Sequence, residues 1–165
     1  MSVNQQKWKL NPVNILLRIP VPWVFVLTYL AGLIFQFILP FNLYSEELLI
    51  YARISGIVLF ILGILFASWS LIIFHRERTT TTPGESSKKI VMHGPYRYTR
   101  NPMYVSLILA YLGEAGILAQ LWPVLALPLV MAYVNWVVIP LEEEVLRRDF
   151  NEEYENYCSC VRRWF

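Results

Sequence analysis

Two polar segments of this chain contain residue types that could hold a charged ligand. In the first, residues 90–104 (IVMHGPYRYTRNPMY), a Gly-Pro turn is followed by two tyrosines and two arginines within six residues. Asn101 and Pro102 then open an apolar run, and these residue types favour the start of a helix. A helix N-terminus attracts anions, and Arg97 and Arg100 add positive charge, so the segment predicts an anion site. The alternative is an interfacial anchor, since tyrosine and arginine are common where helices meet lipid headgroups.

The second segment begins with Glu142, Glu143 and Glu144, directly after an apolar run. Carboxylates at a membrane boundary lose solvation, so they tend to be paired or functional; alternatively, they end the span and face water. Apolar and aromatic residues follow at helical spacing: Leu146, Phe150, Tyr154, Tyr157 and Val161. This stripe predicts an amphipathic helix over 142–161 that lies on the membrane surface or folds back over the ends of the spans.

The elements that must position these segments are apolar and long. Hydrophobic residues make up 56% of the 165 residues and charged residues only 16%, an excess that a small soluble core cannot bury. Four apolar runs, at about 22–39, 48–74, 102–120 and 121–141, are each close to the ~20 residues that a transmembrane helix needs. We therefore predict a single membrane domain over 1–165, all-α and polytopic, with about four transmembrane helices and a cytoplasmic C-terminal amphipathic helix.

Composition also excludes several classes of protein. The net charge is +2, and twelve acidic residues nearly balance the basic ones, which argues against a nucleic-acid partner. The apolar content argues against an ordinary soluble enzyme and against disorder. The two cysteines, Cys158 and Cys160, are too few to form a zinc site, so no metal is predicted.

Charge in the loops predicts the orientation. With four spans, every strongly basic segment falls on one side of the membrane, and Glu46 and Glu47 fall on the other. These basic residues are Lys7, Lys9, Arg18, Arg76, Arg78, Lys88, Lys89, Arg97, Arg100, Arg147, Arg148, Arg162 and Arg163. The positive-inside rule puts that side, with both termini and both polar segments, in the cytoplasm.

The two segments together resemble a known family. The stretch HGPYRYTRNPMY, His93–Tyr104, resembles the isoprenylcysteine carboxyl methyltransferase family and its phospholipid-methyltransferase relatives. The tail EEEVLRRDFNEEYENYCSCVRRWF resembles the second motif of that family, and the likeness covers about residues 79–165. The family often has His at the position of Asn101. Asn151 replaces a family glycine, and asparagine also tolerates a left-handed turn.

The resemblance implies methyl transfer from S-adenosylmethionine, bound on the cytoplasmic side under the tail. It implies cofactor contacts from His93, Gly94, Tyr96, Arg97, Asn101, Pro102, Tyr104 and Glu142, and catalytic roles for Glu142, Glu143, Arg100 and Asn101. Arginine and a helix N-terminus suit the carboxylate of this cofactor, glutamate suits its ammonium, and tyrosine rings suit its adenine and sulfonium.

The methyl acceptor stays open at this level. A lipophilic acceptor would enter sideways from the membrane lipid, and it could be a prenylated thiol-acid, an amino headgroup lipid or a hydrophobic thiol. Two other functions remain alternatives. One is an NADPH-dependent membrane reductase related to the sterol reductases, which would need further basic residues near Arg97 and Arg100 for the 2′-phosphate. The other is a non-enzymatic membrane subunit that uses both segments as interface anchors.

Overall fold

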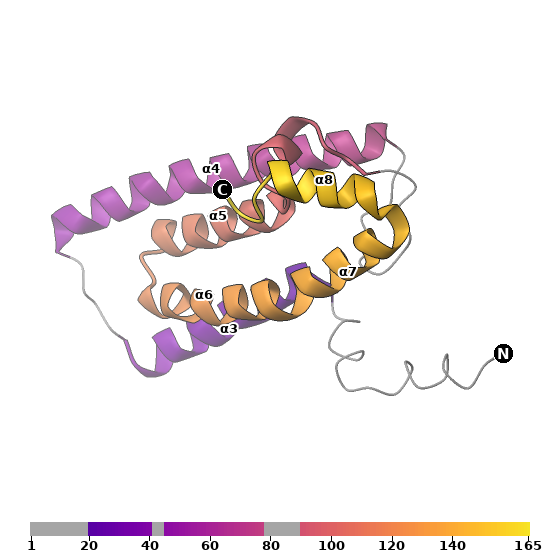
Figure 1. Ribbon diagram of the computed structural model, residues 1–165. Coiled ribbons are helices and arrows are strands. Elements are labelled where there is room, and N and C mark those ends of the chain that lie inside the picture. Colours follow the sequence, from indigo (N-terminus) through magenta and orange to yellow (C-terminus); the bar gives the residue numbers. More distant parts are fainter. Residues whose placement is uncertain (1–19, 41–44, 78–89) are drawn as a thin grey trace, which may run out of the picture.

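Long apolar helices dominate the computed structural model, which describes residues 20–40, 45–77 and 90–165 (Figure 1). No strand occurs among these residues. The helices are α3 (Val21–Ile38), α4 (Glu46–Arg76), α5 (Pro102–Ile117), α6 (Leu121–Tyr133), α7 (Ile139–Phe150) and α8 (Glu152–Cys160). A short 3₁₀ turn, η2 (Gly94–Arg97), precedes α5, and a π-helical turn, η3 (Val134–Val138), joins α6 to α7.

The prediction of a helical membrane protein is confirmed. Three helices are long and apolar enough to cross a membrane: α3, α4 and the continuous helix Leu121–Phe150. The fourth predicted span, 102–120, is the shorter apolar helix α5. It ends early because Ala119 adopts a positive φ of 52° and the N–H of Gln120 turns back to the carbonyl of Ala115, 2.9 Å away.

The helices pack most closely as two pairs, α4 with α5 and α3 with α6 (Figure 1). Small residues let the backbones of α4 and α5 approach closely. A Cβ built on Gly113 would lie 2.5 Å from the backbone nitrogen of Phe60, and one on Gly56 would lie 2.5 Å from that of Ile117. On the other pair, a Cβ on Gly32 would lie 2.8 Å from the Cα of Pro123. These contacts set the distance between the two helices of each pair.

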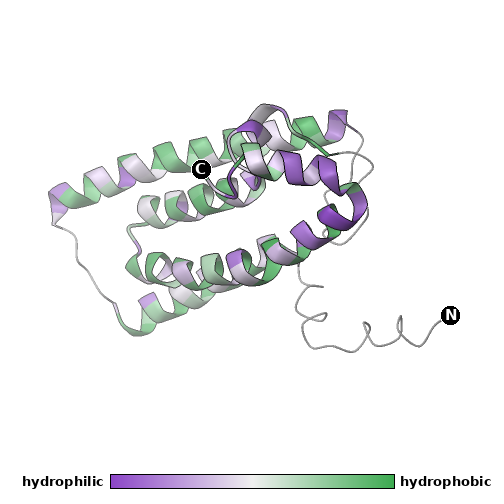
Figure 2. Ribbon diagram, in the orientation of Figure 1, coloured by the Kyte–Doolittle hydropathy of each residue, from purple (hydrophilic) through white to green (hydrophobic). Residues whose placement is uncertain are grey.

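The outer faces of the helices remain apolar. On α4 most large apolar side chains are exposed, and only Gly56, Gly63, Ser70 and Ile73 are buried. Figure 2 shows hydrophobic residues along α3, α4, α5 and α6, with hydrophilic residues gathered on α7 and α8. Such a helix, apolar on all sides, suits a lipid environment.

The predicted tail helix 142–161 is two helices in the structure. The last spanning helix continues without interruption to Phe150, because most residues after Leu141 are good helix formers and none is glycine or proline. Asn151, with φ 44°, then breaks the chain direction before α8. A positive φ favours glycine, and asparagine also tolerates it, as expected from the sequence.

The tail folds back over the ends of the spans, which is one of the two predicted placements. Its aromatic stripe closes a small core: Tyr154 and Tyr157 are buried with Ile90, and Leu146, Phe150, Met92, Cys158 and Val161 pack around them. In Figure 1, α8 lies beside the segment that leads into α5. The two polar segments recognised in the sequence therefore meet at one end of the molecule.

Candidate active site

The segment before α5 is fixed between α4 and α8. Gly94 has a positive φ of 64°, and a Cβ there would collide with the side chain of Ile73 on α4. Tyr96 is buried, with its ring edge-on to Phe74 at 5.3 Å between ring centroids. The hydroxyl of Tyr157 on α8 donates to the carbonyl of Tyr96 over 2.7 Å. This turn is thus held from both sides.

A hydrogen bond joins the two motifs. The hydroxyl of Tyr104, in the first turn of α5, donates to Oε1 of Glu142 on α7 over 2.6 Å, across 38 positions of sequence. Glu142 is half-buried, and its other oxygen, Oε2, has no hydrogen-bond partner among the described residues. The pair therefore offers one carboxylate oxygen to a ligand.

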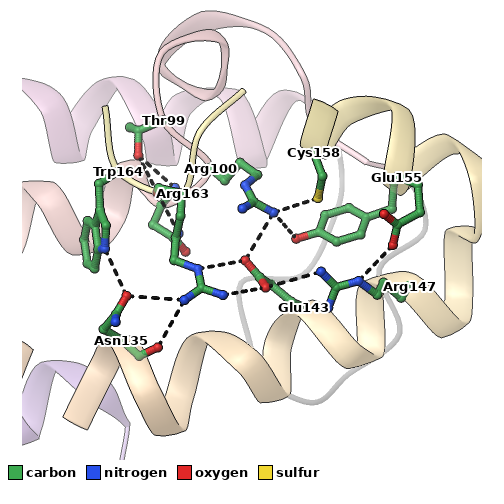
Figure 3. Close-up of polar contacts among 11 residues, drawn as sticks. Thr99, Arg100, Asn135, Glu143, Arg147, Glu155, Cys158, Arg163 and Trp164 are labelled. Carbon is green, nitrogen blue, oxygen red and sulfur yellow. Dashed lines mark hydrogen bonds and ion pairs between the residues drawn. The ribbon is translucent and has the colours of Figure 1, made fainter. Parts of the chain in front are cut away.

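Glu143 has a different environment from its neighbour. It is buried and lies among three arginines, a group that we call the Glu143 cluster: Glu143, Arg100, Arg147 and Arg163 (Figure 3). Arg163 binds both carboxylate oxygens, at 3.1 Å and 2.9 Å, and Nη1 of Arg100 lies 3.2 Å from Oε1. Arg147 lies farther off, at 3.6 Å, and is also paired with the exposed Glu155. Both oxygens of Glu143 are thus occupied by positive partners.

Arg100 is largely buried beneath α8. Its Nη1 lies 2.6 Å from the sulfur of Cys158 and 3.4 Å from the hydroxyl of Tyr154. Burial alone would lower the pKa of the Arg100 guanidinium, but Glu143, Tyr154 and Cys158 together raise it, so the group stays charged. Its Nε is buried without a hydrogen-bond partner in the described part of the chain.

The phenol groups beside the site stay protonated. Burial raises the pKa of Tyr96, and the nearby Tyr157 and Glu142 raise it further. Burial also raises the pKa of Tyr157, against a smaller opposite effect of Arg100. Both phenols therefore remain neutral hydrogen-bond donors across the usual pH range.

The side chain of Asn101 does not cap α5 and binds the C-terminal segment instead. It occupies the N-cap position of α5, but its side chain makes no cap hydrogen bond and donates instead to the carbonyl of Arg163 over 2.9 Å. The hydroxyl of Thr99 donates to the same carbonyl, and the N–H of Arg100 donates to the carbonyl of Arg162. The backbone carbonyls of the C-terminal segment thus hold the start of α5 in place by three hydrogen bonds.

The predicted anion site at the start of α5 has fewer free backbone N–H donors than the sequence led us to expect. The N–H groups of Tyr104 and Val105 both donate to the carbonyl of Asn101, each over 3.1 Å, and the N–H of Asn101 donates to the hydroxyl of Thr99. Pro102 has no N–H and is buried. Few backbone donors of this turn are left for a ligand.

Two predicted cofactor residues lie at the edge of the site. The ring of His93 is exposed, with Nε2 3.4 Å from a carboxylate oxygen of Glu77. Arg97 is exposed and forms no ion pair with the described residues. The other predicted residues lie closer to the meeting point of α5, α7 and the C-terminus: Gly94, Tyr96, Arg100, Asn101, Pro102, Tyr104, Glu142 and Glu143.

Sequence reasoning missed three residues of this region. Nη1 of Arg163 reaches both the carbonyl and the side-chain oxygen of Asn135 at 3.4 Å, and Nε1 of Trp164 donates to the same side chain over 3.1 Å (Figure 3). Asn135, a polar residue inside an apolar span, was a signal in the sequence. The arginine was counted only as a loop charge, and nothing in the sequence distinguished Trp164.

Known proteins resemble the chain over much of its length. Two proteins from Oryza sativa, of subspecies indica and japonica, are each 30% identical to it over 108 residues, covering 64% of this chain and 56% of theirs. Both are named "Probable protein-S-isoprenylcysteine O-methyltransferase". The chain thus spans about half the length of these curated relatives. No solved structure matches it significantly.

A family pattern also matches more than half of the chain. The pattern of the phospholipid methyltransferase family matches residues 51–153, which include most of α4, the segment before α5 and all of α7. Both halves of the site, Tyr104 and Glu142, lie within the matched range. The chain belongs to the phospholipid methyltransferase family.

Proposed function

We propose that this protein is a membrane methyltransferase that takes its methyl group from S-adenosylmethionine and transfers it to a lipophilic acceptor. The observation that carries this proposal is the hydrogen bond between Tyr104 and Glu142. It joins the two motifs of the family at the end of the spanning helices and leaves Oε2 of Glu142 without a partner among the described residues. A half-buried carboxylate of this kind is a natural binding site for a cation.

The residues at this position fit the cofactor. Its ammonium would bind Glu142, and its carboxylate would be attracted by the positive charges of Arg100 and Arg97. Tyr96 and Tyr104 would contribute aromatic surface beside the adenine or the sulfonium. When bound, S-adenosylmethionine supplies a methyl group on a sulfonium. The protein would then act chiefly by holding two reactants in line, and Glu143, occupied by arginines, would support the site and not act as a base.

The apolar outer faces of the helices support a lipophilic acceptor, because such a molecule reaches the site through the bilayer. We place the site and both termini on the cytoplasmic side, where the basic segments of the sequence gather. The rice relatives are named for an isoprenylcysteine acceptor. We therefore propose a prenylated thiol-acid as the first acceptor to test, with amino headgroup lipids and hydrophobic thiols as the other classes.

Calorimetric titration of the detergent-purified protein with S-adenosylhomocysteine tests the cofactor. We expect binding by the unaltered protein, and binding weakened about tenfold or more in Glu142→Gln, since the loss of a charged hydrogen bond is worth about 1.5–3 kcal/mol. Glu144→Gln is the matched control, because Glu144 is exposed on the same helix and should bind as the unaltered protein does. Folded protein that binds NADPH and not S-adenosylhomocysteine would support the reductase alternative instead.

A labelled-methyl assay tests the acceptor. Purified protein, labelled S-adenosylmethionine and each acceptor class are combined in lipid vesicles, and label in the extracted lipid is measured. We expect transfer to one class and its loss in Tyr104→Phe, which removes the hydroxyl bound to Glu142. Protein that binds the cofactor and leaves every class unlabelled would contradict the lipophilic acceptor.

A further inference from the structure

A proline in the last spanning helix leaves a backbone carbonyl that a C-terminal side chain can bind. In the π-helical turn η3, the N–H of Ile139 bonds to the carbonyl of Val134, five positions earlier. In the same register the next bond would join residue 140 to the carbonyl of Asn135. Pro140 has no N–H, so that carbonyl lacks its helical donor. Nη1 of Arg163 lies 3.4 Å from it (Figure 3).

Arg163 joins three segments through that contact. Its guanidinium binds both oxygens of Glu143 on α7 and both oxygens of Asn135. Its backbone carbonyl accepts hydrogen bonds from Thr99 and Asn101, at the start of α5. Neighbouring Arg162 has an exposed side chain, and within the described residues it contributes only its backbone carbonyl. One arginine thus links the turn before α5, through its backbone carbonyl, to the helix that carries Glu142, through its guanidinium.

We propose that Arg163 is a positioning residue, which holds Glu142 against Tyr104 through Glu143 and the open turn at Asn135. Glu142 and Glu143 are consecutive on α7, so the contact of Arg163 with Glu143 fixes where Glu142 lies along the helix axis and which way its side chain points. The planar guanidinium is needed for this, because its three nitrogens are spread in a fork. Nε and Nη2 bind the two oxygens of Glu143 while Nη1 reaches Asn135. The single nitrogen of an ammonium does not span these positions. This inference rests on the proposed cofactor site.

The test compares Arg163→Lys with Arg162→Lys, each alone and combined with Glu142→Gln, in full-length protein in detergent. S-adenosylhomocysteine affinity is measured by titration and folding by the thermal transition. We expect Arg163→Lys to weaken binding roughly tenfold, which corresponds to about 1.4 kcal/mol, and Arg162→Lys to leave it unchanged. In the Glu142→Gln background, Arg163→Lys should add little, since it acts through Glu142.

A second variant separates positioning from stability. Pro140→Ala supplies the missing N–H, which competes with Arg163 for the carbonyl of Asn135. We expect a thermal transition at least as high as that of the unaltered protein, together with weaker ligand binding. A loss of helix stability cannot produce this combination.

Each outcome decides a specific question. If the unaltered protein does not bind S-adenosylhomocysteine, the proposed function fails and the positioning role fails with it. If it binds and Arg163→Lys binds equally well, the positioning role alone is overturned. The same holds if Arg163→Lys weakens binding as much in the Glu142→Gln background as in the unaltered protein, because the effect would then be independent of Glu142.

Discussion

Glu142 and Glu143 are neighbours on one helix but have opposite surroundings. Glu142 is half-buried, shares one oxygen with Tyr104 and keeps the other without a partner in the described chain. Glu143 is buried, with Arg163 on both oxygens and Arg100 at 3.2 Å. Consecutive helical residues point about 100° apart, so one carboxylate faces α5 and the other faces the C-terminus. The family resemblance implied a site role for both residues, and their contacts suggest a division between ligand binding and support.

Removing the charge of Glu143 should destabilise the fold. In Glu143→Gln the largely buried guanidinium of Arg100 and the half-buried guanidinium of Arg163 lose their common counter-charge. Breaking a buried pair costs about 3 kcal/mol at the low end of the known range. Thermal or chemical unfolding of the purified protein measures the loss. Glu144→Gln, on the exposed side of the same helix, should unfold like the unaltered protein. Equal stability of the two variants would show that the Glu143 cluster does not hold the tail.

At the scale of elements, α4 and α5 contact each other through glycines. The Cβ built on Gly113 is 2.5 Å from the backbone of Phe60, a distance that no side-chain rearrangement can relieve. Lipid is as apolar as the helix surface, so close packing and not water exclusion keeps such helices together. Because Tyr104 lies on α5, this packing also fixes one half of the candidate site.

Gly113→Ala should therefore force α4 and α5 apart. We expect a loss of about 2 kcal/mol in unfolding free energy, as for overpacked interiors. Leu62→Ala, at an exposed apolar position of α4, is the control and should cost far less in detergent or lipid. The readout is the unfolding transition of both variants in the same detergent. A Gly113→Ala protein as stable as the control would contradict the close contact.

At the scale of the whole molecule, polar chemistry gathers at one end. The segment before α5, the C-terminal half of α7, α8 and the C-terminus meet there, whereas the turn between α5 and α6 lies at the opposite end (Figure 1). Tyr157, Arg100 and Arg163 connect these segments by direct hydrogen bonds or ion pairs. The arrangement agrees with the loop charges, which predicted that both polar segments share a side of the membrane.

Labelling of cysteines tests that orientation. Cys160 on α8 is exposed, and Leu118, in the turn after α5, is exposed at the opposite end. In intact host cells a membrane-impermeant maleimide should label Leu118→Cys, in a chain whose own cysteines are replaced by serine. It should leave Cys160 of a Cys158→Ser chain unlabelled until the cells are opened. Labelling of Cys160 in intact cells would place the site outside.

The sequence by itself determined the features that depend on local properties. Apolar runs predicted the helices, because a chain in lipid must satisfy its own backbone hydrogen bonds. The aromatic stripe of the tail and the two family motifs indicated which segments meet. Asn151 was recognised as a residue that tolerates a turn, and it breaks the tail into two helices.

The tertiary structure alone decided which polar groups pair. Asn135 and Arg163 are 28 positions apart, and their contact depends on the open π turn, the break at Asn151 and the path of the last five residues. Asn101 has the residue type of a helix cap, yet its side chain binds the carbonyl of Arg163 because the C-terminus passes within 2.9 Å. A residue type such as asparagine can make several alternative hydrogen bonds, and the packing of distant segments determines which of them forms.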